Sequence, residues 1–238
     1  MTPSAPGDTN WRVCAIIPAL NASTTVGRIV DRVRQLGLDP IVVNDGTTDA
    51  TVQAATTAGA RVISHVTNQG KGLALRSGFA VALQFGYDVV VTLDSDGQHD
   101  PEDIPRLLEA CRAQQAPIVI GHRVIDGERM PAMRRWTNRA MSTMVSMVAR
   151  QSIPDSQCGL RVIRRDVLEA LRLTSARFDL ETELLLAVAA RGWAIRSVPI
   201  RTIYHNTHRS HIRPLRDGLR FVGLVARYAL WPRRHPGP

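Results

Sequence analysis

Short apolar runs alternate with longer amphipathic stretches over the first 120 residues of the chain. Short runs rich in β-branched residues predict strands, and stretches with apolar positions every three or four residues predict helices. Strands that alternate with helices favour an α/β fold, in which a mostly parallel central sheet is covered by helices on both faces. The predicted strands lie at 13–17, 41–43, 61–64, 89–93 and 118–120, and the predicted helices at 24–36, 49–58, 72–85 and from about 101.

The pattern changes after residue 121. A periodic apolar side predicts a long helix at 131–150, and a loop rich in turn-forming residues follows at 152–159. The sequence contains no internal repeat, low-complexity tract or linker, and 238 residues suit one large domain. The remainder predicts a short strand, helices from Asp166 and from Leu180, a strand at 194–199 and a final helix from about Pro214.

The sequence carries no uninterrupted apolar stretch of about eighteen residues that would span a membrane. Arg227 interrupts the best candidate, 221–231. The polar first ten residues contain no apolar segment, so no secretory signal peptide is expected. Three scattered cysteines without CxxC spacing predict neither a disulfide framework nor a zinc site, and they fit a reducing compartment. We therefore expect a cytoplasmic protein, whose contact with a membrane would be peripheral and at its inner face.

The net charge of +9 is divided unevenly along the chain. Residues 1–120 hold 9 basic and 12 acidic residues (net −3), whereas 121–238 hold 21 and 9 (net +12). Either the arginines only solvate the surface, or the C-terminal half faces phosphate groups or an anionic membrane. The segment 201–220, which includes Arg209, precedes an amphipathic stretch that forms either an interfacial helix or an ordinary docked helix. A nucleic-acid partner is not expected, because aromatic residues are not interleaved with basic ones.

Polar segments follow the predicted strands at the edge where parallel sheets bind ligands. The first runs from Pro18 to Asn21, and the second covers 44–49. Asp45 directly follows a buried strand, so its carboxylate is placed to accept hydrogen bonds from a base or a ribose. Asp49 either faces a ligand or caps the next helix.

A turn with two glycines surrounds the only lysine of the chain, Lys71, at 68–72. The turn resembles a phosphate-binding loop but lacks the P-loop spacing and the trailing Ser or Thr, so a triphosphate hydrolase is not favoured. Because Lys71 lies at the start of a helix, it is still suited to face a diphosphate.

The segment 94–99 ends another apolar strand. Asp94 and Asp96 straddle one residue, so in an extended turn both carboxylates point to one side, with Gln98 as a neutral oxygen ligand. Oxygen ligands suit Mg²⁺ or Mn²⁺, and so few protein ligands leave positions for water and phosphate oxygens. The alternative is a solvated turn in which Asp100 caps the next helix.

These segments, followed by the loop Asp155-Ser156-Gln157-Cys158-Gly159-Leu160-Arg161, occur in the order found in family 2 glycosyltransferases. From about residue 12 to about 225 the chain most closely resembles the polyprenyl-phosphate (dolichol-phosphate) mannosyl- and glucosyltransferases. The resemblance implies a GT-A fold and the transfer, with inversion, of a hexose from a nucleotide-diphosphate sugar of GDP-mannose or UDP-glucose type to a polyprenyl or dolichyl phosphate. The domains that it implies are a flexible tail at 1–11, a GT-A catalytic domain at 12–213, and a C-terminal amphipathic helix and tail at 214–238.

Roles carry over from the family residue by residue. Asp45 becomes a nucleobase contact, and Arg123, with Arg134 and Asn138 one helical turn apart, resembles the group that holds the lipid phosphate and the sugar. The 155–161 loop is similar to the loop that closes over the sugar. The family usually has two adjacent aspartates where this chain has Asn44-Asp45, so no role is carried over to residue 44. The predicted residues are, for catalysis, Asp96, Arg123, Asp155 and Gln157; for substrate binding, Pro18, Asn21, Asp45, Lys71, Asp94, Arg134, Asn138 and Arg209; and for the metal ion, Asp94, Asp96 and Gln98.

A lipid phosphate is already anionic near pH 7, so in-line displacement at the anomeric carbon requires no dedicated general base. Two alternatives stay open. The same fold acting on a soluble acceptor would use Glu181, Glu183 or Asp155 as a base, unless the two glutamates are surface charges of their helix. A nucleotide- or anionic-surface-binding module without catalysis would use 94–98 only as a capped turn.

Overall fold

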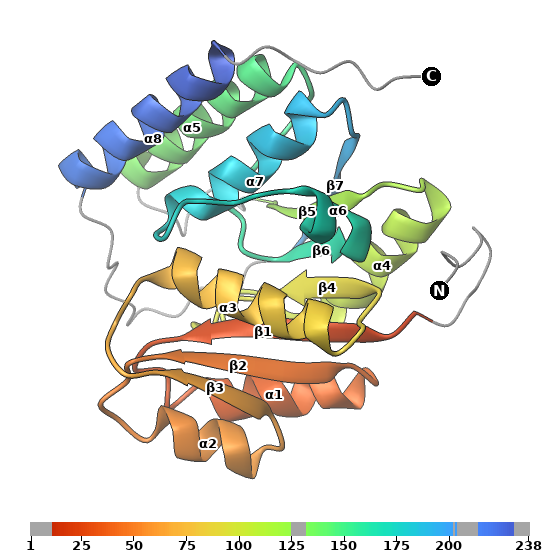
Figure 1. The fold of residues 1–238 in the computed structure, drawn as a ribbon, viewed down its shortest axis with the longest axis vertical. Helices are drawn as coiled ribbons and strands as arrows, with labels where there is room; N and C mark the ends of the chain where they lie inside the picture. The colour runs from red at the N-terminus through yellow and green to blue at the C-terminus, as the bar shows by residue number, and fades with distance from the viewer. Residues whose placement is uncertain (1–10, 125–131, 202, 204–213, 231–238) are drawn as a thin grey trace.

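The computed structural model describes residues 11–124, 132–201, 203 and 214–230, and these form one sheet with helices packed on it (Figure 1). The strands are β1 Val13–Ala19, β2 Asp39–Asp45, β3 Arg61–His65, β4 Val89–Thr92, β5 Ile118–Arg123, β6 Arg161–Arg164 and β7 Ile195–Ile200. The α-helices are α1 Val26–Gln35, α2 Thr51–Thr57, α3 Lys71–Gln84, α4 Ile104–Ala113, α5 Ala132–Ala149, α6 Arg165–Ala170, α7 Asp179–Ala190 and α8 Pro214–Ala229, and a 3-10 turn, Pro101–Asp103, precedes α4.

The strand order is β3-β2-β1-β4-β6-β5-β7, and only β6 runs antiparallel to its neighbours. The expected mostly parallel sheet is therefore confirmed. The carboxyl ends of β1 to β5 all lie at one edge of the sheet. Because β6 runs in the opposite direction, the loop that precedes it, 155–160, also reaches this edge. The predicted polar segments consequently meet on one side of the molecule.

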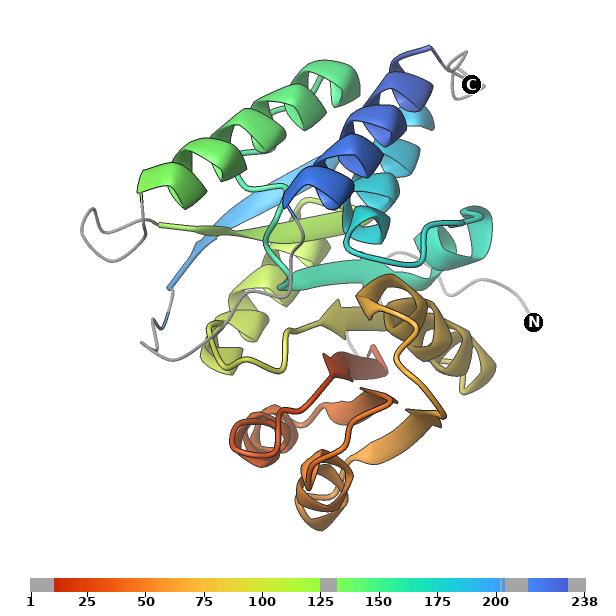
Figure 2. The same cartoon turned by 90° about the vertical axis from the view of Figure 1, so that its left-hand side faces the viewer.

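Alternation along the strands divides the apolar core into two layers. In β1, Cys14 and Ile16 face one layer, and Ala15 and Ile17 face the other. The first layer is closed by α3, α5, α6, α7 and α8, and the second by α1, α2 and α4. Figure 2 shows the sheet lying between α1, α2 and α4 on one side and α3 on the other, so helices cover both faces as expected.

Two acidic residues that were candidates for helix caps have structural partners. The Asp100 carboxylate accepts the N–H of Glu102 at 3.1 Å and caps the turn before α4. Asp49 accepts the N–H of Thr51 at 3.0 Å and that of Ser23 at 3.2 Å, so it ties the start of α2 to the loop after β1. Desolvation acts to raise the pKa of Asp49, but the hydrogen bonds from Thr51 and Ser23 outweigh it and lower the pKa to about 2. The cap interpretation is therefore confirmed for Asp100, whereas Asp49 lies one residue before the N-cap of α2, Ala50, and holds the loop instead.

The C-terminal helix α8 packs against α5 and α7. Its Phe221 and Leu224 are buried in the same core layer as Leu75 of α3 and Val145 of α5. Among the described residues, no helix combines the length and the apolar character needed to cross a bilayer. One face of α8 is thus docked on the core, while contact of its outer face with a membrane, and the division at 213 and 214 between two segments, stay predictions.

Candidate active site

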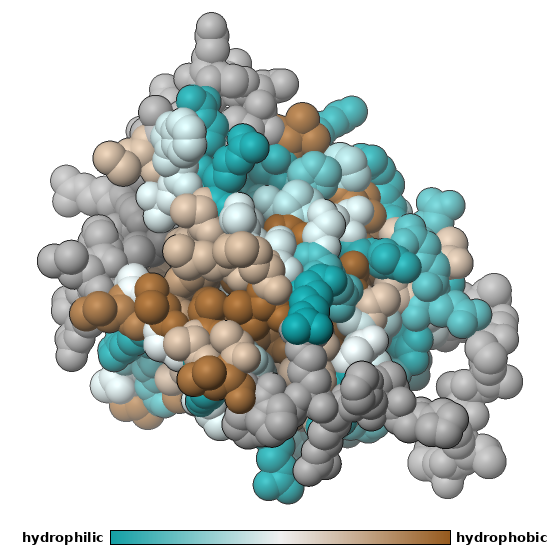
Figure 3. Space-filling view, turned by 90° about the horizontal axis from the view of Figure 1, so that it is seen from above, coloured by the Kyte–Doolittle hydropathy of each residue, from teal (hydrophilic) through white to brown (hydrophobic). Residues whose placement is uncertain are grey.

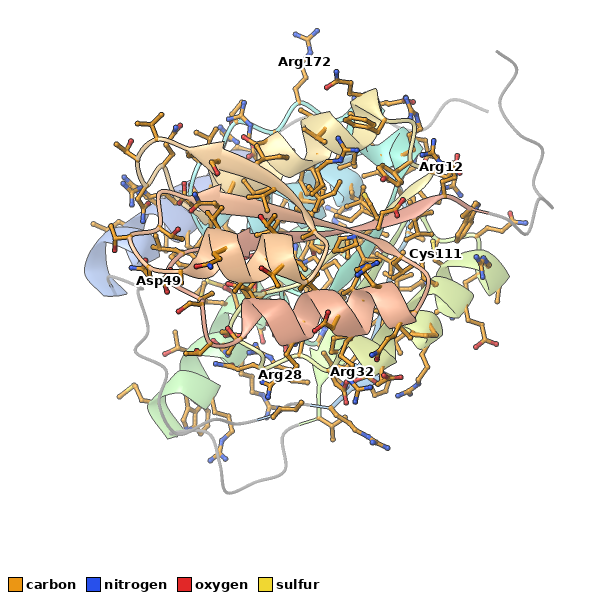
Figure 4. The ribbon with its side chains drawn as sticks, turned by 90° about the horizontal axis from the view of Figure 1, so that it is seen from below. Arg12, Arg28, Arg32, Asp49, Cys111 and Arg172 are labelled. Atoms are coloured by element: carbon orange, nitrogen blue, oxygen red, sulfur yellow. The ribbon has the colours of Figure 1, made fainter. Side chains whose placement is uncertain are left out.

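The loops after β1 and β2 are joined by side chains at the carboxyl edge. Pro18 is buried in β1 opposite Val43 of β2. Asn21 has a positive φ of 51°, and its carboxamide oxygen accepts the N–H of Thr48 at 3.0 Å. Figure 4 places Asp49 of this edge far from Arg12, which lies at the opposite edge of the sheet. The structure thus brings Pro18 and Asn21 beside the loop that contains Asp45; their roles in substrate binding stay predictions.

Asp45, at the end of β2, organises the neighbouring turn. Its Oδ1 lies 2.9 Å from His65 Nδ1 and accepts the N–H of Gln69 at 2.9 Å, and its Oδ2 accepts the N–H of Gly70 at 2.8 Å. His65 in turn contacts the Ser77 hydroxyl through Nε2 at 2.9 Å. These contacts occupy three of the roughly four acceptor positions of a carboxylate. Contact with a nucleobase stays a prediction, and sequence reasoning missed the role of His65.

The glycine after Asp45 allows two loops of the chain to approach each other closely. Gly46 has a φ of 73°, and a Cβ there would lie 2.5 Å from the backbone nitrogen of Asn68. Asn44 donates to the Ser64 hydroxyl at 3.2 Å and accepts the N–H of Thr47 at 2.8 Å. Both residues therefore stabilise the loop itself, which agrees with carrying over no family role to residue 44.

Lys71 begins α3 and lies between two carboxylates. Its Nζ is 2.6 Å from Asp94 Oδ1 and 2.9 Å from Glu181 Oε2. Burial acts to lower the pKa of Lys71, but the two carboxylates outweigh it and raise that pKa above its usual range. Lys71 is therefore positively charged, but in this structure its charge is paired with both carboxylates, and a contact with a diphosphate stays a prediction.

The 94–99 segment is fixed at the end of β4. Thr25 donates its hydroxyl hydrogen to the carbonyl of Ser95 at 2.6 Å, and Asp96 Oδ1 accepts the N–H of Gln98 at 2.9 Å. Burial acts to raise the pKa of Asp94, but the Lys71 ammonium outweighs it and holds that pKa well below its usual range. Asp94 is therefore an anion over the whole physiological pH range.

The donor set of this segment fits a hard divalent cation that is completed by ligand oxygens. Asp94 and Asp96 offer carboxylates and Gln98 an amide oxygen, and Asp96 is partly exposed with one hydrogen bond, to Gln98, within the described residues. Those residues contain no cluster of three or more His, Cys, Asp or Glu side chains able to enclose a metal ion. Mg²⁺ keeps several water or phosphate ligands and needs only one or two carboxylates, so an open site of this kind suits it.

Arg123 and Asp155, predicted separately, form one buried ion pair. The Arg123 Nε and Nη2 atoms donate to the two Asp155 oxygens at 2.7 and 2.9 Å. Burial acts to raise the pKa of Asp155, but the Arg123 guanidinium outweighs it and lowers that pKa. The fork-shaped contact fixes the 155–161 loop to the end of β5.

Helix α5 supports the same loop. Ser142 accepts the N–H of Ser156 at 3.0 Å, and Gln157, which is partly exposed, donates to the Ser156 hydroxyl at 3.0 Å. Asn138 lies on α5 and is partly exposed. Arg134 lies in α5, but its side chain is outside the described part of the chain, as is the whole of Arg209. Their predicted contacts with substrate stay predictions.

Sequence reasoning gave no role to Arg161, which is 1% exposed at the start of β6. Its guanidinium donates to the carbonyl oxygens of Cys158 (2.9 Å), Ser156 (2.9 Å) and Glu181 (2.6 Å). Its place at the end of the 155–161 motif was the sequence signal that could have revealed the role of Arg161. Arg161 joins the loop to α7 and so fixes the position of Glu181.

Glu183 is not available as a base. Its carboxylate accepts hydrogen bonds from the backbone and hydroxyl of Thr174, from the N–H of Ser175 and from Arg227 of α8, at 2.8 to 3.1 Å. Burial acts to raise the pKa of Glu183, but these hydrogen bonds outweigh it and lower the pKa. Glu181 and Glu183 are both buried, so the interpretation that they are surface charges of their helix is wrong.

Comparison with known proteins shows the family to which this chain belongs. The sequence profile of glycosyl transferase family 2 matches residues 14–172, which include the 44–49, 68–72, 94–99 and 155–161 segments. The chain belongs to glycosyl transferase family 2. This family 2 chain is 35% identical over 204 residues to the undecaprenyl-phosphate mannosyltransferase of Micrococcus luteus, covering 79% of this chain and 82% of that protein. It is 28% identical over 212 residues to the UDP-N-acetylglucosamine–dolichyl-phosphate N-acetylglucosaminyltransferase of Methanococcus voltae, covering 79% and 84%.

The fold of this glycosyl transferase family 2 chain is also found in solved structures. Glucosyl-3-phosphoglycerate synthase from Mycobacterium tuberculosis, in complex with Mn²⁺, UDP and phosphoglyceric acid, superposes with a TM-score of 0.73. The two sequences are 21% identical, and the match covers 93% of this chain and 80% of that chain. The GT-A fold that the resemblance implied is confirmed.

Proposed function

We propose that this chain transfers a hexose from a nucleotide-diphosphate sugar to a polyprenyl phosphate, with inversion at the anomeric carbon. The observation that carries the proposal is that the open carboxylate site at Asp94 and Asp96 lies at the same sheet edge as the 155–161 loop, which is anchored by the Arg123–Asp155 ion pair. The names of the Micrococcus and Methanococcus relatives, which both specify a lipid-phosphate acceptor, support the proposal.

The donor half would lie over the ends of β1, β2 and β4. Asp94, Asp96 and Gln98 would hold a Mg²⁺ or Mn²⁺ ion, which supplies positive charge to the departing diphosphate. Asp45 would orient the base, with its carboxylate held in place by His65 and the turn that begins α3. This arrangement positions the sugar and stabilises the leaving group without any proton transfer.

The acceptor half would require no base. A phosphate oxygen of the lipid attacks the anomeric carbon, the new bond is phosphate oxygen to carbon, and the bond from that carbon to the nucleoside diphosphate breaks. Two of the three carboxylates considered as bases for a hydroxyl acceptor, Asp155 and Glu183, have their oxygens occupied by hydrogen-bond donors, and their lowered pKa values make them weak bases. This favours an acceptor that is already anionic over a sugar hydroxyl.

A donor and acceptor screen tests the proposal. Purified protein with Mg²⁺ or Mn²⁺ is incubated with UDP- and GDP-sugars, each with a polyprenyl phosphate in detergent or with a small phosphorylated acid, and the released diphosphate is measured. We expect release of one nucleoside diphosphate in the presence of polyprenyl phosphate only. Equal release with the small acid would favour the soluble-acceptor alternative, and no release with any pair would favour a binding module without catalysis.

We also propose that α5 and α8 form the surface that meets an anionic membrane. The two helices lie side by side, and Figure 3 shows apolar residues gathered on the face that they form. Met133 and Trp136 of α5 are 78% and 69% exposed, and Leu219 of α8 is 75% exposed. Exposed arginines lie on the same helices, at Arg139 and Arg220. An apolar face bordered by arginines is the pattern of an interfacial helix on anionic lipid.

Vesicle sedimentation tests this surface. We expect Trp136→Glu to weaken binding to phosphatidylglycerol-containing vesicles about tenfold, because it removes an interfacial aromatic ring and adds a repelled charge. Val66→Glu is the matched control, since Val66 is 97% exposed but lies outside α5 and α8. Equal binding of Trp136→Glu and the unmodified protein would show that this face does not meet the lipid.

A further inference from the structure

Lys71 is shared by two carboxylates that come from different parts of the fold. Asp94 follows β4, and Glu181 lies in the first turn of α7. The Lys71 ammonium is 2.6 Å from the first and 2.9 Å from the second. The ammonium therefore occupies one oxygen of a carboxylate that the proposed function assigns to a divalent cation.

The contact between Lys71 and Glu181 is fixed by the backbone. A Cβ on Gly72 would lie 2.4 Å from the carbonyl oxygen of Arg177, and the N–H of Leu73 donates to the carbonyl of Ala176 at 2.9 Å. The first turn of α3 is thus in direct contact with the segment that enters α7. This contact holds Lys71 beside Glu181 whatever Asp94 binds.

The two carboxylates differ in what else they face. The side chain of Asp94 is 25% exposed and has His99 Nε2 3.7 Å from its Oδ2. That of Glu181 is 11% exposed, and its Oε1 is buried without a hydrogen bond within the described residues, with Arg161 Nη2 at 3.8 Å. Without Lys71 the buried Glu181 carboxylate would keep only the more distant Arg161 as a cationic partner, whereas Asp94 is accessible to an incoming ion.

We infer that Lys71, positioned by Glu181, is an internal counter-cation that competes with the divalent metal ion for Asp94. The inference rests on the proposed function, in which Asp94 is a metal ligand. In the free protein the ammonium neutralises Asp94 and weakens binding of the metal alone. Asp94 would have to exchange the ammonium for the metal in order to hold it, and Glu181 would keep Lys71 at the edge of the site.

Binding of Mn²⁺ without nucleotide, measured from the electron paramagnetic resonance signal of free Mn²⁺, tests the competition. The main variant is Lys71→Met with Glu181→Gln, which leaves the net charge unchanged and no unpaired buried carboxylate. We expect this variant to bind Mn²⁺ at least about tenfold more tightly than the unmodified protein, because a like charge beside the ligand is removed. Glu181→Gln alone is expected to bind Mn²⁺ several-fold more weakly, since Lys71 then has Asp94 as its remaining carboxylate partner.

Unchanged or weaker Mn²⁺ binding by the double variant overturns the inference. Adding Asp96→Asn to both backgrounds separates that outcome from failure of the proposed function. If Asp96→Asn abolishes Mn²⁺ binding while the double variant gains no affinity, the metal site stands and the competition is rejected. If Asp96→Asn changes nothing in either background, the metal site itself is wrong and the competition falls with it. Lys71→Gln with Glu181→Gln, which retains a hydrogen bond between the two side chains, replaces the methionine variant if the latter does not fold.

Discussion

Asp96→Ala is expected to reduce sugar transfer to polyprenyl phosphate by about a hundred- to a thousandfold, because it removes a carboxylate that would hold the metal ion against the departing diphosphate. Within the described residues Asp96 makes one hydrogen bond, to the N–H of Gln98, and it is partly exposed. Its removal should therefore cost little stability, and the loss should appear in the rate of diphosphate release at saturating donor.

A nearby carboxylate supplies the control for this prediction. Asp100 lies four residues further along the same loop and caps the turn before α4 through the N–H of Glu102. Asp100→Ala should lower the melting temperature slightly, by loss of a cap worth about 1 kcal/mol, and leave transfer within a few-fold of normal. Transfer by Asp96→Ala at a near-normal rate would remove the metal-site assignment.

Much of the fold follows from local pattern. Buried runs such as 89–93 and amphipathic stretches such as 24–36 carry their periodicity in adjacent residues, so the elements were predictable within a few positions. The antiparallel direction of β6 was not predictable from the sequence. Four residues, Arg161–Arg164, contain no directional signal, and their direction is set by pairing with β4 and β5. This antiparallel direction nevertheless brings the 155–160 loop to the sheet edge where the carboxyl ends of β1 to β5 lie.

In the candidate site, too, some features were predictable from the local sequence and others were not. The position of Asp94 and Asp96 after an apolar strand is a local feature, and sequence reasoning placed both at the correct edge. The partners of these residues are not local. Lys71 and Glu181 are far apart in the sequence, and their contact depends on how α3 packs against the entry to α7. Which acidic residues are free to act was also unpredictable, because it depends on the donors that the fold brings to each carboxylate.

Arg123→Met is expected to have the largest effect on the acceptor side of the site. It leaves the buried Asp155 carboxylate without the guanidinium that donates to both of its oxygens. Breaking one partner of a buried pair costs about 3 to 5 kcal/mol, so urea unfolding at neutral pH should show a loss of that size. Transfer should fall at least about a hundredfold, since the 155–161 loop loses its anchor and, if Arg123 contacts the acceptor phosphate as proposed, that phosphate loses a cation.

The double variant Arg123→Met with Asp155→Asn leaves no unpaired charge. It therefore separates the contribution of Arg123 to stability from its contribution to binding the acceptor phosphate. Stability should recover largely, while transfer should stay low if Arg123 contacts the acceptor phosphate. Recovery of both would limit Arg123 to holding the loop.

The pH dependence of unfolding gives an independent check of the Arg123 and Asp155 pair. In the unmodified protein the depressed pKa of Asp155 contributes stability that is fully present above the unfolded value, about 3.9, and is lost as pH falls through the folded pKa. In Arg123→Met, burial is no longer offset, so the pKa of Asp155 should rise and its ionisation should destabilise the fold as pH increases. The stability difference between the two proteins should therefore be largest above the raised pKa of Asp155 in the variant, and it should shrink as pH falls from there to the depressed pKa of Asp155 in the unmodified protein. A difference that stays constant between neutral pH and pH 3 would show that Arg123 stabilises the fold through contacts other than the Asp155 carboxylate.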